Sequence, residues 1–232
     1  EIVLVPTFRL PVLIHSRSGN AKWLLEIAHS NPLWLNPKDA APRGLKAGDL
    51  AKVSTRIGSF VLRVWTTEGI KPGVIACSHH LGRWRKEEQK VNNRWSATPV
   101  RFERTGNQLL VRRLEPEGLR PFASADQDSE RLWWKEVGVH QNMTFPVQPD
   151  PVSGMHCWHQ VVRVEAAGPD DREGDVRVDH DKARAVWREW LETARPGPGP
   201  GGLRRPRWLK RPLRPREELF ETRPDGEAGA EG

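Results

Sequence analysis

The chain has 232 residues, 37% of them hydrophobic, which is enough for one or two domains with a substantial core. It has only two cysteines and no Cys-x-x-Cys pair, which excludes a disulfide framework and a four-thiolate zinc or iron–sulfur site within this sequence. No apolar run approaches the ~20 residues of a membrane helix, and the first residues do not resemble a secretory signal, so we expect no direct membrane insertion.

The net charge of +7 comes from one segment near the end of the sequence. Residues 203–216 contain seven Lys or Arg and no acidic residue, and the remaining sequence is balanced. Basic side chains around Trp208 could contact phosphates and stack on bases, so a nucleic-acid-binding protein is one alternative. The prolines of this arm and the preceding Pro/Gly linker instead favour an extended strap on a larger protein. We therefore expect no nucleic-acid partner.

The first third of the sequence mixes short strands with two helical segments. Residues 2–14, interrupted by two prolines, predict an edge strand. Residues 21–30 place their apolar side chains on one helical face. Asn36 and Pro37 then have the residue types of an N-cap and a first helical position, and Gly44 ends that turn.

A run of short strands begins after Gly48. Alternating apolar residues and glycine-rich turns predict strands near 50–56, 59–66, 72–78, 107–114 and 160–167. Gly58-Ser59 is expected to form a hairpin turn. Many short strands with few helices are typical of a β-barrel or β-sandwich.

The other segments predict loops, one helix and an extended end. Residues 85–107 show few strand signals, and residues 168–178 look like a polar break. Apolar side chains at helical spacing follow, and they predict an amphipathic helix capped by Asp179 or Asp181. Both cysteines, Cys77 and Cys157, are expected to be buried thiols.

Several segments resemble, in order and spacing, the C-terminal domain of molybdopterin-guanine-dinucleotide oxidoreductases, the dimethyl-sulfoxide-reductase superfamily. They read HSRSGN at 15–20, LWLNPKDA at 33–40, GLKAGDLAKVSTRIGS at 44–59 and TTEGIKPGVIACSHHLGRW at 66–84. The block HQNMTFPVQPDPVSGMHCWHQVVRVE at 140–165 resembles that domain's closing segment.

The resemblance implies a mainly β fold, a six-stranded double-psi β-barrel like that of aspartate decarboxylase, which covers the pterin ends of the cofactor. The implied domain spans residues 1–167. A polar break and the amphipathic helix would then fill 168–195. The linker, basic arm and acidic tail would fill 196–232 in an extended form.

The resemblance also assigns cofactor contacts, whose residue types suit a group with flat rings, hydrogen-bonding edges and anionic oxygens. The implied cofactor-binding residues are His15, Ser16, Arg17, Ser18, Asn20, Asn36, Asp39, His79, His80, Arg83, Trp84, Asn142, Asp150 and His159.

Some of these residues have a second interpretation. Asn36 and Asp39 can equally cap and close a turn, and Trp84 can equally belong to the core. His79 or His80 could transfer a proton, although cofactor contact is favoured. The segment HCWH at 156–159 has residue types that could bind a metal. Strand alternation would place His156 and His159 on opposite faces, so no metal site is expected there.

The resemblance implies a cofactor-binding domain or subunit of an oxidoreductase that carries molybdopterin guanine dinucleotide with molybdenum or tungsten. Iron–sulfur cysteines and a protein ligand for the metal are not found here, so they are expected in N-terminal domains or in a separate catalytic chain. An iron–sulfur electron-transfer subunit is a further expected partner. Alone, this chain would not be catalytically complete.

The HHLGRW block and the tryptophans favour the sulfur-compound branch, such as sulfite dehydrogenase or thiosulfate and polysulfide reductase subunits. The prokaryotic cytoplasm is the favoured compartment, with membrane association through partner subunits. The alternative is an assembly module without cofactor.

Overall fold

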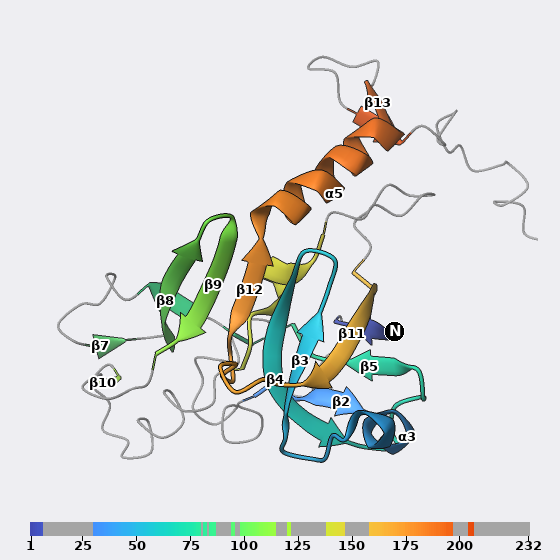
Figure 1. Cartoon of the computed structure of the whole chain (residues 1–232), viewed down its shortest axis with the longest axis vertical. Helices are drawn as coiled ribbons and strands as arrows, with labels where there is room; N and C mark the ends of the chain where they lie inside the picture. The colour runs from blue at the N-terminus through green and yellow to red at the C-terminus, as the bar shows by residue number, and fades with distance from the viewer. Residues whose placement is uncertain are drawn as a thin grey trace, which may run out of the picture.

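The computed structural model describes residues 1–6, 30–79, 81–82, 84–86, 94–95, 98–114, 120–121, 138–146, 158–196 and 204–206. Six strands of this part form a closed barrel (Figure 1): β1 Ile2–Val5, β2 Leu33–Leu35, β3 Leu50–Ser54, β4 Gly58–Thr66, β5 Val74–Ala76 and β11 Gln160–Ala166. Their order is β2-β5-β1-β11-β3-β4, and pairing of β2 with β4 completes the ring. The pairs β1–β5 and β2–β4 are parallel, and the others are antiparallel. This confirms the mainly β fold and the six-stranded barrel expected from the sequence.

Strand β4 also belongs to a second group of strands. One of its edges pairs with β3, whereas the other edge pairs first with β12 Val176–Asp179 and then with β2. From β12 the sheet continues through β9 Gln108–Arg113, β8 Thr98–Thr105 and β6 Trp84–Lys86. These four strands form an extension beside the barrel (Figure 1).

Four expectations about local structure were wrong. The edge strand expected within residues 2–14 is β1, which pairs on both sides, with β5 and with β11. Gly58 and Ser59 lie in β4, and the chain reverses earlier, where the Thr55 N–H donates to Gly58 O at 2.8 Å. Residues 98–105, expected to be loop, form β8, and residues 176–179, mostly within the expected polar break, form β12. The apolar pattern of these two strands is weak because many of their residues are charged. Among their described side chains, only Val100, Val176 and Val178 are buried.

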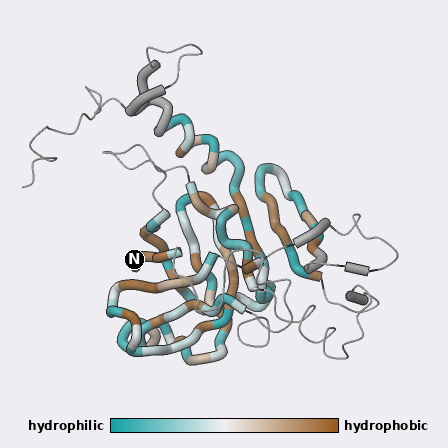
Figure 2. Tube along the Cα trace, turned by 180° about the vertical axis from the view of Figure 1, so that it is seen from behind, coloured by the Kyte–Doolittle hydropathy of each residue, from teal (hydrophilic) through white to brown (hydrophobic). Residues whose placement is uncertain are grey.

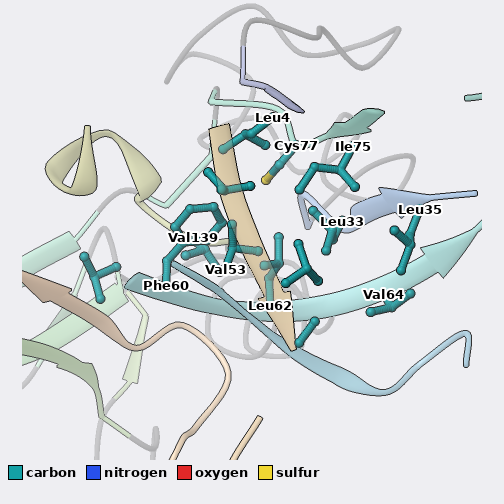
Figure 3. Packing of buried hydrophobic residues seen from close by; sticks show 14 of the residues in the cluster. Leu4, Leu33, Leu35, Val53, Phe60, Leu62, Val64, Ile75, Cys77 and Val139 are labelled. Atoms are coloured by element: carbon teal, nitrogen blue, oxygen red, sulfur yellow. The ribbon is translucent and has the colours of Figure 1, made fainter. Parts of the chain in front are cut away.

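The core lies inside the barrel and follows strand alternation (Figure 3). Leu4, Leu33, Phe60 and Ile75 come from four different strands and have no exposed surface. Hydrophobic residues follow the same barrel strands in Figure 2. Full burial of each such side chain stabilises the fold by about 1.5–3 kcal/mol. The ring of inward side chains therefore fixes the register of all six strands.

The other elements are short, except for one helix. They are α3 Pro37–Ala40, η1 Ala41–Arg43, β7 Arg94–Trp95, β10 Arg120–Pro121, η3 Gln141–Thr144, α5 His180–Thr193, β13 Ala194–Pro196 and β14 Arg204–Pro206. The predicted amphipathic helix is α5, which leads away from the barrel (Figure 1). Asp179 Oδ1 caps it by accepting from the backbone N–H groups of Asp181 and Lys182, each at 3.0 Å. Within the described residues, no helix combines the length and the apolar character needed to cross a membrane.

The connection between β11 and β12 fastens the extension to the barrel through buried acids. The Asp175 carboxylate, which has no exposed surface, accepts from Arg112 of β9 at 2.8 Å. Asp171 pairs with Lys52 of β3 at 3.3 Å and with Arg177 of β12 at 3.5 Å. Because these partners come from three strands, the connection acts as a brace across the sheet.

Candidate functional site

Strand directions bring distant segments together at one end of the barrel, here called the η3 end. It comprises residues 77–79 and 81–82 after β5, residues 138–146 around η3, and residues 158–160 at the start of β11. The Thr55 hydroxyl of the β3–β4 turn donates to Thr144 O at 2.5 Å, which ties η3 to the barrel. The opposite end, here called the α3 end, comprises residues 36–49 and 66–73.

Two glycines allow the loops of the η3 end to touch backbone against backbone. Gly82 has φ +91°, and a Cβ there would clash with the backbone of Val139 and His140. Gly138 has φ +74°, and a Cβ there would clash with Asn31 and Leu81. Both positions therefore require glycine, both for the positive φ and for the close approach.

An imidazole and an indole lie side by side at this end. His79 Nδ1 lies 2.9 Å from Pro6 O, and because a carbonyl oxygen only accepts, Nδ1 is the donor. The planes of the His79 and Trp158 rings differ by 20°, and their centroids are 6.3 Å apart. The Phe145 ring lies edge-on to the Trp158 ring. Trp158 keeps 40% of its surface exposed.

Two consecutive residues of η3 carry buried amide oxygens. Gln141 is 1% exposed, and its Nε2 donates to Cys77 O at 3.0 Å. Among the described residues, neither Gln141 Oε1 nor Asn142 Oδ1 has a hydrogen-bond partner, although both atoms are buried. An unsatisfied buried acceptor costs about 1–3 kcal/mol, and a hydrogen bond from an external donor would remove this cost.

Burial favours the neutral forms of His140 and Cys77 at this end. Burial lowers the pKa of His140, so its imidazole is uncharged at neutral pH. Burial also raises the pKa of the Cys77 thiol far above its usual value, against a smaller opposing effect of Gln141, so Cys77 is an unreactive thiol as predicted. In the part of the chain that the structure describes, no three His, Cys, Asp or Glu side chains are grouped to hold a metal ion.

Asn36 and Asp39 lie at the α3 end, away from His79 and Asn142. Asn36 Oδ1 caps α3 by accepting from Lys38 N at 2.9 Å, and its Nδ2 donates to Ile70 O at 2.7 Å. Asp39 Oδ2 accepts from Gly73 N at 2.8 Å. Both side chains thus do what the alternative interpretation expected, and a cofactor contact for either one stays a prediction.

The α3 end also carries an open depression of about 360 Å³, lined by residues such as Pro37, Ala40, Leu45 and Thr66. Its lining is mostly apolar and includes neither of the unpaired acceptors. A polar ring with several N–H groups would find few partners there.

The other predicted residues divide into two groups. His159 is exposed directly before β11, and Trp84 begins β6, although its side chain is not among those described. The remaining predictions lie outside the described residues: His15, Ser16, Arg17, Ser18, Asn20, His80, Arg83 and Asp150. The sequence pattern did not indicate Gln141 and Trp158 as site residues, although both stand inside the closing block at 140–165.

Part of the chain is similar to known proteins. Residues 4–108 match the family model described as "Molydopterin dinucleotide binding domain". The chain is 36% identical over 77 residues to dimethyl sulfoxide reductase DmsA of Haemophilus influenzae, which covers 33% of this chain and 9% of that protein. It is 33% identical over 76 residues to the arsenate respiratory reductase molybdopterin-containing subunit ArrA of Chrysiogenes arsenatis, covering 29% and 9%.

A solved structure is similar at a lower level. Acetylene hydratase from Pelobacter acetylenicus matches with a TM-score of 0.41 and 15% identity over 72% of this chain and 18% of that one. The aligned segment spans 9% of the length of each of the two curated relatives named above.

Proposed function

We propose that this chain is a molybdopterin dinucleotide-binding domain of the dimethyl-sulfoxide-reductase superfamily, and that the η3 end of its barrel holds the pterin of a molybdenum or tungsten cofactor. The match of residues 4–108 to the family model and the similarity to DmsA support the first part. The cofactor is molybdopterin guanine dinucleotide in this proposal. The observation that carries it is that two buried acceptors on η3, Gln141 Oε1 and Asn142 Oδ1, have no hydrogen-bond partner among the described residues.

The residues at the η3 end fit such a group. A pterin edge carries N–H donors, and Gln141 Oε1 and Asn142 Oδ1 are acceptors already removed from water. The partly exposed face of Trp158 beside His79 suits a flat ring. When bound, the metal of the cofactor supplies the redox chemistry. This chain's own residues bind and orient the pterin and keep water from its edge.

The proposed whole is an oxidoreductase of which this chain is one part. The relatives named above reduce dimethyl sulfoxide or arsenate according to their names, and they are far longer than this chain. We propose a sulfur-compound substrate, in the manner of sulfite dehydrogenase or thiosulfate and polysulfide reductase. The iron–sulfur clusters and the metal's protein ligand would lie in other domains or in a separate catalytic chain, with an iron–sulfur electron-transfer subunit as partner.

The test is cofactor analysis of the native complex that contains this chain. The complex is purified under reducing conditions and oxidised, and pterin fluorescence and released guanine nucleotide are then measured. The proposal expects both. A folded native complex without pterin would contradict it and would favour the assembly module.

A matched pair of variants locates the pterin. Asn142→Leu removes the buried acceptor with little change in volume, and it should reduce pterin content. Asn107→Leu makes the same substitution at the exposed β8–β9 turn, where Asn107 donates to Asp181, and should leave pterin content unchanged. Equal pterin content in both variants would place the cofactor elsewhere.

A further inference from the structure

Asn31 is a buried asparagine that neither the resemblance nor the comparisons assign to any role. It lies just before β2 at the η3 end and is 2% exposed. Its Nδ2 donates to Ser78 O at 2.6 Å and to Val139 O at 3.0 Å, and its Oδ1 accepts from Val139 N at 2.7 Å. The polar atoms of this side chain are thus used by backbone groups 47 and 108 residues away in the sequence.

These bonds join the two loops that carry the proposed pterin contacts. Ser78 directly precedes His79, and Val139 stands two residues before Gln141. The amide takes both the N–H and the C=O of Val139, as a neighbouring strand would. Gln141 Nε2 adds a second tie by donating to Cys77 O.

The backbone of both loops is built around this amide. Gly138 must lack a side chain, because a Cβ there would clash with Asn31 Oδ1. The carbonyl oxygen of Asn31 also accepts from the Cys77 thiol at 3.4 Å. If Asn31 lost its side chain, three backbone groups would lose a partner inside the protein, and the loops would be free to separate.

We propose that Asn31 is a positioning residue that holds the His79 loop and the η3 loop at the separation needed to grip the pterin. This inference rests on the proposed function. Asn31 is buried, and both its Nδ2 and its Oδ1 form hydrogen bonds to the backbone of the two loops. It therefore acts through these loops and does not itself contact the cofactor.

The test uses Asn31→Ala and the milder Asn31→Asp, which keeps an acceptor for Val139 N, in the native complex. A matched control is Asp175→Asn, which weakens another fully buried hydrogen-bonded group at the brace, away from both loops. Pterin content per folded protein and the rate of pterin release are measured beside Tm. Mutation of a residue that orients the binding residues of a metal site, without touching the metal, lowers affinity on the order of tenfold or more. We expect pterin release about tenfold faster in the Asn31 variants and unchanged in Asp175→Asn at a similar fall in Tm.

The outcomes separate the two proposals. If the unmutated complex contains pterin and the Asn31 variants retain it as well as Asp175→Asn does, the positioning role is wrong while the proposed function stands. If the unmutated complex contains no pterin, the proposed function is wrong, and the pterin role of Asn31 is wrong with it.

Discussion

Asn31 and Asn36 flank the same three-residue strand, β2, and they show how the two ends of the barrel differ. Both are buried, and both bond to backbone of distant segments. At the α3 end, Asn36 and Asp39 complete a cap and a turn. At the η3 end, Asn31 closes two loops but leaves the neighbouring acceptors of Gln141 and Asn142 without a partner among the described residues. The polar side chains of Asn36 and Asp39 therefore stabilise the α3 end, whereas Gln141 Oε1 and Asn142 Oδ1 at the η3 end contribute no hydrogen bond within the described residues.

The largest difference between the ends should appear in two glycine substitutions. Gly138 and Gly44 have similar positive φ values, +74° and +65°, but only Gly138 has neighbours where a Cβ would be. Gly44→Ala should cost about 1 kcal/mol of unfolding free energy, from left-handed strain alone. Gly138→Ala adds a clash with Asn31 and Leu81 and should cost about 3 kcal/mol or more.

Urea unfolding of both variants measures this difference. Gly44→Ala serves as the control for backbone strain. Equal losses of stability would mean that the loops of the η3 end are not packed as closely as described.

Asn36→Ala should give a smaller effect at the α3 end. Loss of an N-cap costs about 1 kcal/mol, and the pterin content of the native complex should not change. Thermal unfolding and pterin fluorescence of the same preparation measure both quantities. A loss of pterin would instead support the cofactor contact that the resemblance assigned to Asn36.

The smallest effect should be a pH dependence that comes from His140. Burial lowers the pKa of His140 below the 6.5 of a free imidazole, so between these two pKa values the unfolded chain binds more protons than the folded one. Folding stability from this residue is therefore fully present above about pH 6.5 and falls as the pH drops towards the folded pKa.

Tm measured from pH 7.5 to 5.5 tests this sign, with His140→Asn as the control. The wild-type Tm should fall more steeply than that of the variant as the pH is lowered. Parallel curves would show that His140 is not buried in its neutral form.

The sequence predicted the barrel well because its strands alternate inward and outward residues. Val162 and Val164, separated by Arg163, show this alternation in the letters alone. Strand β12 was missed because it has four residues, two of them charged, and it gains its place by pairing with β4 and β9. That pairing depends on contacts between segments far apart in the sequence.

The candidate site could be predicted only in part for the same reason. His79 and Asn142 stand in segments that resemble a known domain. Gln141 became a candidate only when its burial was known, and this burial depends on Cys77, 64 residues away. Trp158 became one only when its ring was found beside His79.

The most direct test is a cryo-electron-microscopy map of the native complex that contains this chain. We expect density for a pterin ring system within contact distance of Asn142 and Gln141, beside Trp158. Pterin density at the α3 end, or density for a complete cofactor that touches neither η3 nor Trp158, would contradict a pterin site at the η3 end.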